Sequence, residues 1–344
     1  MSQRLRIGVI GGGANTRLRH LPGLQAIKGV EVVTICNRTR ESSERVAKEF
    51  NIPQVAATWQ EVVEARNVDA VCIGTWPNTH AKFTVAALRA GKHVLCEARM
   101  ARNLAEAELM LAESKLHPKL VAQIVPAPMS LPFDATVTDL LASGELGALR
   151  EVFLTCTHAG WADPAAPTSW RQDFALSGKN TLYLGIFYEI ILRWLGRDVA
   201  SVMADSSIYT RERKDAEGMP QPVMIPESLS ILGRFEDGSR LVGHFSGVET
   251  TAPRNEIRLN FSRGGLRLDL TAGELWRADA SGQEKRVEIA PAKRGAWRVE
   301  ADFVDSIREG KPVTLTDFAS GVRYMRFTDA VWESWKNDQG RVVL

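Results

Sequence analysis

Short apolar runs alternate with amphipathic stretches over the first 125 residues of the chain. The apolar runs, which are typical of buried strands, span residues 6–10, 30–36, 70–74, 93–96 and 120–125. Between them, apolar residues recur at helical spacing over residues 40–50, 59–65, 79–90 and 104–116. Strands that alternate with helices favour a parallel sheet with right-handed crossovers. We therefore expect an α/β domain over residues 1–125.

The pattern changes after Pro126, Pro128 and Pro132, which mark a domain boundary. A helix is expected over residues 133–143, and the two last amphipathic stretches, 297–309 and 318–336, predict helices as well. Between these helices, alternating apolar and polar positions predict strands over residues 149–158, 201–209, 228–235, 239–247, 256–261, 265–270 and 286–289. One large antiparallel sheet is the simplest way to bury their apolar faces. We expect residues 126–344 to form a second, α+β domain.

Composition excludes several classes of function. The 344 residues are 44% hydrophobic and 24% charged, as in ordinary globular proteins, and the net charge of +2 gives no reason to expect nucleic acid or a membrane surface as partner. No signal-peptide pattern and no apolar run of about 18 residues is present. The cysteines, Cys36, Cys72, Cys96 and Cys156, lie in or beside predicted strands without metal-ligand spacing, and the histidines are scattered. We expect a cytoplasmic protein with reduced thiols and no metal site.

A glycine-rich turn follows the first predicted strand. Gly11, Gly12 and Gly13 lead through Ala14 and Asn15 into Thr16. A strand that enters a helix through such a turn allows backbone amides and the helix N-terminus to meet a pyrophosphate. Because threonine fills the third small position of the fingerprint, a turn that binds nothing is the alternative. The pattern predicts a dinucleotide-binding site.

The choice of dinucleotide depends on the end of the second strand. Roughly 20 residues beyond the turn, where an acidic residue would hold the ribose hydroxyls of NAD, the chain has Asn37, Arg38 and Arg40. Arginine pairs with a 2′-phosphate, so we predict that NADP is preferred over NAD. The alternative is that both arginines only begin a solvated helix.

Five segments resemble the glucose-fructose oxidoreductase, inositol dehydrogenase and rhizopine-catabolism family (Gfo/Idh/MocA): residues 8–13, 20–23, 75–80, 90–97 and 170–171. The resemblance extends over nearly the whole chain. It implies an N-terminal Rossmann domain, a C-terminal open antiparallel sheet through which we expect a homo-oligomer, dimer or tetramer, and NAD(P)-linked chemistry on a sugar, cyclitol, related polyol or sugar acid. It also implies cofactor contacts from residues near the ends of the fourth and fifth strands and from the second domain, with Glu97 near the nicotinamide ribose. These residues are Thr75, Trp76, Pro77, Asn78, His80, Glu97, Ala98, Arg99 and Trp170.

The chain departs from this family where protons are handled. The family commonly has Glu-Lys-Pro where this chain has Glu97-Ala98-Arg99, so the lysine that ordinarily contacts the reacting hydroxyl is missing. The resemblance also implies an aspartate and a histidine at the positions that Tyr183 and Phe187 occupy.

Other residues are candidates to replace these groups, because hydride transfer to a carbonyl needs a group that moves a proton. We predict that Tyr183 is this group and that Lys179 assists it. On a helix Lys179, Tyr183 and Phe187 would share one face, and an ammonium group stabilises phenolate. The alternative is a packed tyrosine beside a solvated lysine.

Residues 158–173 offer further polar groups. We expect His158, Trp161, Arg171 and Asp173 to converge over the nicotinamide, although a histidine at a strand end often has only a structural role. The guanidinium of Arg171, or that of Arg99, is suited to hold an anionic substrate.

Three hypotheses follow from these residues. The first is an NADP-dependent oxidoreductase. The second is an enzyme that retains its cofactor and oxidises its substrate only transiently, during elimination, hydrolysis or epimerisation. The third is a catalytically silent dinucleotide-binding protein, which Ala98, Tyr183 and Phe187 together support. All three stay open, since the fold alone does not determine the reaction.

Overall fold

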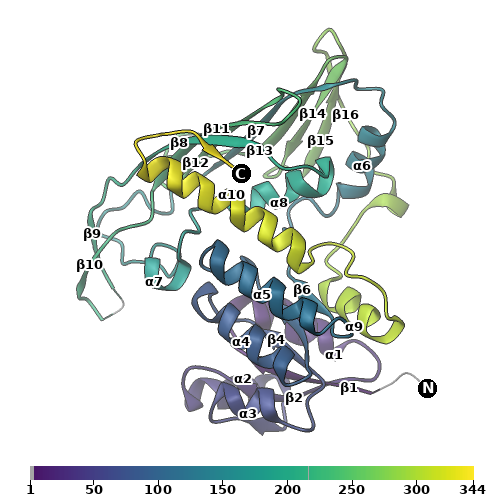
Figure 1. Cartoon of the computed structure of the whole chain (residues 1–344), viewed down its shortest axis with the longest axis vertical. Helices are drawn as coiled ribbons and strands as arrows, with labels where there is room; N and C mark the ends of the chain where they lie inside the picture. The colour runs from purple at the N-terminus through teal and green to yellow at the C-terminus, as the bar shows by residue number, and fades with distance from the viewer. Residues whose placement is uncertain (1–3, 216) are drawn as a thin grey trace. The chain divides into compact units, whose positions relative to one another are not determined.

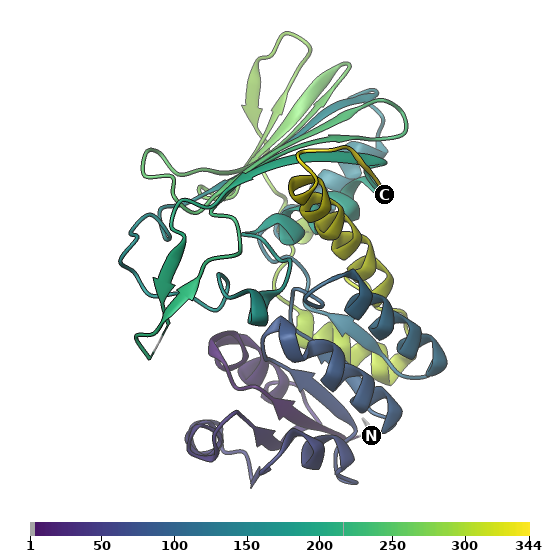
Figure 2. The same ribbon diagram turned by 60° about the vertical axis from the view of Figure 1, so that its left-hand side comes forward.

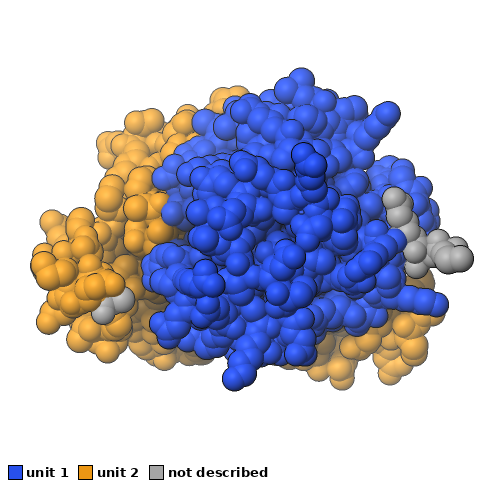
Figure 3. Space-filling view, turned by 90° about the horizontal axis from the view of Figure 1, so that it is seen from below, with its two compact units in different colours: residues 1–126, 298–322 blue, residues 127–297, 323–344 orange. Residues whose placement is uncertain are grey.

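The computed structural model describes residues 4–215 and 217–344 and divides the chain into two compact units, coloured separately in Figure 3. Unit 1 comprises residues 1–126 and 298–322, and unit 2 comprises residues 127–297 and 323–344. The sequence pattern placed one boundary at residue 125 and contains no sign of the later return. The helix α9 (Val299–Glu309) therefore belongs to unit 1, although it follows most of unit 2 in the chain.

Unit 1 is built on a six-stranded parallel sheet. Its strands are β1 (Leu5–Ile10), β2 (Val30–Cys36), β3 (Gln54–Val55), β4 (Ala70–Ile73), β5 (His93–Cys96) and β6 (Ala122–Ile124), in the order β3-β2-β1-β4-β5-β6. This is the strand order of a Rossmann sheet, which confirms the expected fold of the first domain. All four residues of β4 are buried, because helices cover both faces of such a sheet.

Helices α2 (Arg40–Phe50), α3 (Trp59–Glu64), α4 (Pro77–Arg89) and α5 (Leu104–Leu116) connect these strands (Figure 1). Side-chain oxygens of Thr39, Thr58 and Asn103 accept hydrogen bonds from backbone amides in the first turns of α2, α3 and α5. These N-terminal caps determine the residue at which each helix begins. The predicted bounds of α2 and α5 agree with the structure at both ends.

Unit 2 contains a nine-stranded sheet in the order β16-β15-β14-β13-β7-β12-β11-β8-β17. Its strands are β7 (Leu149–Thr157), β8 (Ser201–Ser207), β11 (Ser228–Arg234), β12 (Arg240–Ser246), β13 (Asn255–Phe261), β14 (Gly264–Asp269), β15 (Glu274–Ala278), β16 (Glu284–Arg286) and β17 (Val342–Val343). The large sheet is confirmed, but it is mixed, because β12 pairs with β7 in parallel. A separate ribbon pairs β9 (Glu212–Lys214) with β10 (Pro220–Pro222).

The main helices of unit 2 are α6 (Asp134–Ala142), α8 (Leu184–Leu195) and the part of α10 (Phe318–Lys336) that follows residue 322; α7 (Phe174–Ser177) is a single turn. Phe187 on α8 packs against Phe245 on β12, and Ser334 on α10 accepts a hydrogen bond from Ala204 N on β8, so both helices lie on the same sheet. In the described part of unit 2 no helix covers the other face (Figure 2). Leu232 and Met203, which are paired across β11 and β8, are exposed there.

Two further expectations concern the whole chain. All four cysteines are free and buried. Among the described residues, none of the helices has both the length and the apolar character that a membrane crossing requires.

Candidate functional site

The glycine turn lies where β1 and β4 end, at the point where the strand order of the sheet reverses. Gly11 has a φ of +93°, which favours glycine. A Cβ added to Gly74, directly after β4, would lie 2.0 Å from Thr16 Oγ1 and 2.4 Å from Gly11 O. The two loops therefore touch backbone to backbone, and a larger residue at Gly74 would separate them.

The turn leaves space for a phosphate group on its outer side. Gly13, Ala14 and Asn15 are exposed, and a Cβ added to Gly13 would meet only Gly74 O, at 3.5 Å. Thr16 is buried instead, and its hydroxyl donates to Gly11 O at 2.9 Å. Thr16 thus holds the helix close to the strand, which is the task of the third glycine in the usual fingerprint. The residues present fit a dinucleotide.

The end of β2 is tied to the same turn by Asn37. Its Oδ1 accepts from Gly12 N at 2.6 Å, and its Nδ2 donates to Ser42 Oγ at 3.0 Å. Arg38 and Arg40 are exposed, and Arg40 Nε pairs with Glu44 Oε1 at 2.7 Å within α2. Of the three residues predicted from this strand end, Asn37 contacts the glycine turn, and residues 36–40 include no carboxylate.

The loop after β4 leads from Thr75 into α4, with Trp76 preceding the first turn and Pro77 and Asn78 in it. Trp76 is 38% exposed, whereas His80 is fully buried. The ring nitrogens of His80 lie 3.0 Å from Thr75 O and 3.0 Å from Arg99 O, and burial lowers the pKa of this histidine. His80 therefore fixes the two loops and presents no exposed surface to a ligand.

The end of β5 carries Glu97, whose carboxylate is held from several sides. Glu97 Oε1 accepts from the Asn15 side chain and lies 2.9 Å from His20 Nε2, and Oε2 accepts from Ala98 N at 3.1 Å. The other ring nitrogen of His20, Nδ1, lies 2.5 Å from Glu300 Oε1 on α9. Glu300 was not among the predicted site residues, because 280 positions separate it from His20. The side chain of Arg99 is 3% exposed, which leaves almost none of its surface to solvent.

In unit 2, His158 and Tyr183 form an aromatic cluster with Trp161. The His158 ring lies edge-on to Tyr183 and to Trp161, with ring centroids 6.1 Å and 5.8 Å apart. His158 Nδ1 accepts from Gly160 N at 3.0 Å, which assigns the proton of the neutral ring to Nε2. Burial and the charge of Arg171 lower the pKa of His158. This histidine is therefore a neutral donor through Nε2 near pH 7.

Lys179 does not share a helical face with Tyr183, so the predicted arrangement of these two residues is wrong. Helix α8 begins at Leu184, after Leu182 with a φ of +49°, so Lys179 lies in the preceding loop. Its ammonium pairs with Asp329 of α10 at 2.5 Å. Phe187 is fully buried, one turn beyond Tyr183, which is partly exposed.

Arg171 lies 4.3 Å above the Trp170 ring, measured from the guanidinium carbon to the ring centroid. Its Nε is buried and has no hydrogen-bond partner among the described residues. The carboxylate of Asp173 caps α7, with Oδ1 accepting from Ala175 N at 2.8 Å. The guanidinium of Arg171 thus keeps one N–H without a partner among the described residues, whereas the carboxylate of Asp173 has a structural role. The expected convergence of these residues on the nicotinamide stays a prediction.

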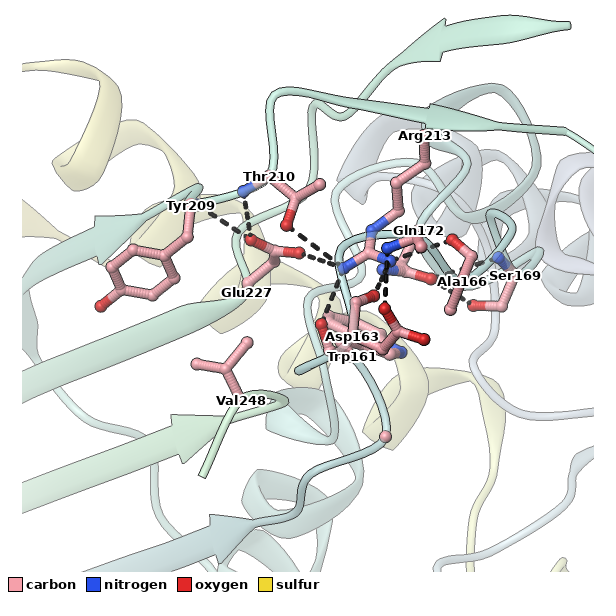
Figure 4. A network of polar contacts seen from close by, with 12 residues as sticks. Trp161, Asp163, Ala166, Ser169, Gln172, Tyr209, Thr210, Arg213, Glu227 and Val248 are labelled. Carbon is pink, nitrogen blue, oxygen red and sulfur yellow. Dashed lines mark hydrogen bonds and ion pairs between the residues drawn. The ribbon is translucent and has the colours of Figure 1, made fainter. Parts of the chain in front are cut away.

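A buried ion pair that the sequence did not indicate holds the loop between His158 and Arg171 (Figure 4). The guanidinium of Arg213, on β9, donates to Glu227 Oε1 at 2.9 Å and to three carbonyl oxygens, those of Trp161, Asp163 and Ala166. Glu227 Oε2 also accepts from the amides of Tyr209 and Thr210. Both side chains are almost completely buried, so this network fixes the backbone of residues 161–166.

Two family models match the chain. The model of the GFO/IDH/MocA oxidoreductase family, with an NAD-binding Rossmann fold, matches residues 5–123, and the GFO/IDH/MocA C-terminal domain matches residues 135–267. Levoglucosan dehydrogenase of Pseudarthrobacter phenanthrenivorans is 25% identical, with 96% of both chains covered. Inositol 2-dehydrogenase of Serratia proteamaculans is 28% identical, with 69% of this chain and 66% of the relative covered.

Solved structures agree in fold. An oxidoreductase domain protein from Kribbella flavida superposes with a TM-score of 0.88 at 24% identity, and 99% of each chain is covered. Levoglucosan dehydrogenase in complex with NADH and L-sorbose superposes with a TM-score of 0.87 at 23% identity, again over 99% of each chain.

Proposed function

Because the chain belongs to the GFO/IDH/MocA oxidoreductase family, we propose that it transfers hydride between a pyridine nucleotide and a sugar, cyclitol, related polyol or sugar acid. The observation that carries this proposal is the open glycine turn where the strand order reverses. The names of the relatives, levoglucosan dehydrogenase and inositol 2-dehydrogenase, support the substrate class. The nucleotide supplies or accepts the hydride when it is bound, and residues 11–15, 75–78 and 97 would hold it.

In this proposal, residues of unit 2 transfer the proton. Unit 1 has Ala98 where the family resemblance implies a lysine, and a methyl group cannot transfer a proton. Tyr183 is partly exposed and lies beside His158, whose Nε2–H is a donor. We assign the proton donor and acceptor to the Tyr183 hydroxyl and a hydrogen bond to the substrate oxygen to His158. Arg171 would hold a carboxylate or phosphate of the substrate.

The preferred nucleotide in this proposal is NADP, with NAD as the alternative. Support comes from the absence of a carboxylate between residues 36 and 40 and from the exposed guanidinium of Arg38, which is free to turn toward a 2′-phosphate. Arg40 is the weaker candidate, because it pairs with Glu44. The NADH complexes among the structural neighbours do not support this preference.

Two further parts of the proposal concern assembly and compartment. The uncovered sheet face of unit 2, with Leu232 and Met203 exposed, is suited to pack against a second copy of the chain, as the family resemblance implies. Four buried free thiols are typical of a reducing compartment, which supports a cytoplasmic location.

Steady-state kinetics test the proposal. Sugars, polyols and sugar acids are screened with NAD and with NADP, and the absorbance of the reduced nicotinamide is followed. Tyr183→Phe should reduce kcat by roughly 10²–10⁴-fold, as expected for the loss of a general acid or base, while the Kd of the nucleotide stays unchanged. Tyr209→Phe is the matched control, because that ring is 64% exposed. Unchanged turnover of Tyr183→Phe would exclude this assignment.

Other results of the same screen overturn more of the proposal. Conversion of substrate without a net absorbance change would indicate transient oxidation, and nucleotide binding without any conversion would indicate a silent binding protein. No observation on the structure favours either of these. Absence of nucleotide binding would refute the function as a whole.

A further inference from the structure

The buried contact of His20 with two carboxylates is the observation that the nucleotide site does not yet explain. His20 ends the π-helical turn η1 (Thr16–His20), which follows the glycine turn and precedes α1 (Leu21–Gln25). Its ring is fully buried, with Nε2 at 2.9 Å from Glu97 Oε1 and Nδ1 at 2.5 Å from Glu300 Oε1. Short π-helical turns are often found at functional sites. Here the turn places an imidazole between the ends of β5 and α9.

The chemistry of this contact determines the charge of the ring. An ionised carboxylate only accepts hydrogen bonds, and a neutral imidazole has one N–H to donate. Two ionised carboxylates at hydrogen-bond distance from both ring nitrogens are both satisfied only by an imidazolium. Burial alone would lower the pKa of His20, but Glu300 and Glu97 raise it to about 9. Burial would likewise raise the pKa of Glu97, yet His20 and Asn15 lower it.

Two other titratable groups close to this network are neutral. Cys72 on β4 lies near enough to both carboxylates to be affected by their charges, and burial together with these charges raises the pKa of its thiol. His80 on α4 lies near Glu97, and burial lowers its pKa. The imidazolium of His20 thus lies between the charges of Glu97 and Glu300.

The absence of a side chain at Gly23 leaves space for the carboxylate of Glu300. A Cβ added to Gly23 in α1 would lie 2.8 Å from Glu300 Oε2 and 2.9 Å from its Cδ. Glu300, which belongs to the segment 298–322 of unit 1, therefore packs directly against Gly23 in the segment 1–126. Any larger residue at position 23 would collide with its side chain. This close approach distinguishes the contact from a surface ion pair, since only 4% of the Glu300 side chain and 13% of the Glu97 side chain are exposed.

We propose that His20 and Glu300 are positioning residues that fix the Glu97 carboxylate for the ribose of the bound nucleotide. His20 and Asn15 occupy Oε1 of Glu97, and Ala98 N occupies one side of Oε2, so the remaining acceptor position of Oε2 has a defined direction. Glu300 acts through His20, because it keeps both ring nitrogens protonated and holds the ring in place. The inference rests on the proposed function, since it takes the ribose as the group that Glu97 meets.

The first test measures the protein without nucleotide. In the full chain labelled with ¹⁵N-histidine, the two ring nitrogens of His20 should show the shifts of an imidazolium at pH 7.5, assigned by comparison with His20→Gln. In Glu300→Gln the pKa of His20 should fall toward its ordinary value, because a neutral amide replaces one carboxylate. A neutral His20 ring in the wild-type protein would overturn the inference.

The second test measures NAD and NADP binding by calorimetry, and kinetics with the substrate found in the screen. In Glu300→Gln and His20→Gln the Kd and KM of the nucleotide should rise roughly tenfold, as for the loss of one charge-assisted hydrogen bond. The KM of the second substrate and kcat at saturating nucleotide should change less than twofold. The matched control is Glu113→Gln, which removes the carboxylate that pairs with His117 and Arg89 elsewhere in unit 1. It should lower the melting temperature and leave nucleotide binding unchanged.

Gly23→Ala keeps the test decisive if Glu300→Gln does not fold. Alanine favours the helix, and its Cβ displaces the Glu300 carboxylate without removing any charge. This variant should fold, shift the ¹⁵N signals of His20 and weaken nucleotide binding. Nucleotide binding as tight as in the wild type by all three variants would overturn the positioning role and leave the proposed function intact. A wild-type protein that binds no nucleotide would overturn both.

Discussion

The buried pair of Arg213 and Glu227 allows a prediction whose size follows from the structure. Substitution of Arg213 by Met keeps much of the side-chain volume and removes the guanidinium. The side chains of the pair are 1% and 0% exposed, so the carboxylate of Glu227 would remain buried without its counter-charge. The carbonyl oxygens of Trp161 and Asp163 would also each lose a hydrogen bond from the guanidinium, of 2.7 Å and 2.6 Å respectively, although Asp163 O keeps a longer one from Ala166 N at 3.3 Å.

These losses set the magnitude. Removal of one partner from a buried ion pair costs about 3–5 kcal/mol. Each carbonyl that loses this hydrogen bond adds at most about 1 kcal/mol, but this partly repeats the first term, so we expect Arg213→Met to lower the free energy of unfolding by about 4 kcal/mol. For a unit of this size, that corresponds to a decrease of the melting temperature of roughly 8–16 °C.

Urea and thermal unfolding, followed by circular dichroism, measure the effect. Arg211→Met is the matched control, because this neighbouring arginine is exposed and its loss should change the free energy by less than about 0.5 kcal/mol. The double variant Arg213→Met with Glu227→Leu should be more stable than Arg213→Met alone, since it removes the isolated carboxylate. A decrease of less than 1 kcal/mol for Arg213→Met, or a double variant that is less stable still, would show that this pair is not buried as described.

Three further predictions use the same kind of reasoning. Because the folded protein raises the pKa of His20 from 6.5 to about 9, the stability it contributes is complete below pH 6.5 and is lost as pH rises through 9; the difference is on the order of 3 kcal/mol, and urea unfolding of His20→Gln should lack this pH dependence. Leu232→Lys places a charge on the uncovered sheet face and should convert an oligomer into monomers in sedimentation velocity, and an unchanged mass would contradict an interface there. Arg38→Ala should weaken NADP binding about tenfold and leave NAD binding unchanged, and equal effects on both would exclude contact with the 2′-phosphate.

The part of the fold that the sequence predicts best is the sheet of unit 1 with its helices. The strands are buried on both faces and appear as uninterrupted apolar runs, and caps such as Thr39 and Asn103 mark where helices start. These signals are local, so the strands and the helix starts can be predicted without knowledge of the tertiary fold. The strand β15 was missed for the opposite reason: only Leu275 is buried in it, so its alternation is too weak to detect.

Long-range contacts limited the prediction of the site. The Glu300–His20 pair joins residues 280 positions apart, and Arg213 with Glu227 acts on a loop that begins some 50 positions earlier. No periodicity or motif records such a pairing. The prediction that Lys179 shares a helical face with Tyr183 was wrong for a local reason. The left-handed backbone at Leu182 interrupts the single helix that the spacing suggests. A leucine in this conformation is uncommon, and no sequence rule indicates it.

Phe187 cannot be the group that transfers the proton, because its side chain has no ionisable group. It occupies the position where the family resemblance implies a catalytic histidine, and its side chain is fully buried, edge-on to Phe245 with ring centroids 5.6 Å apart. A histidine at this position would have to reach the substrate, whereas the phenylalanine is part of the core between α8 and β12. Position 187 therefore serves the packing of unit 2, and its side chain cannot transfer a proton. One turn earlier, Tyr183 is partly exposed and borders His158, so the side chain that we propose as proton donor and acceptor lies in the same segment of chain as the buried Phe187.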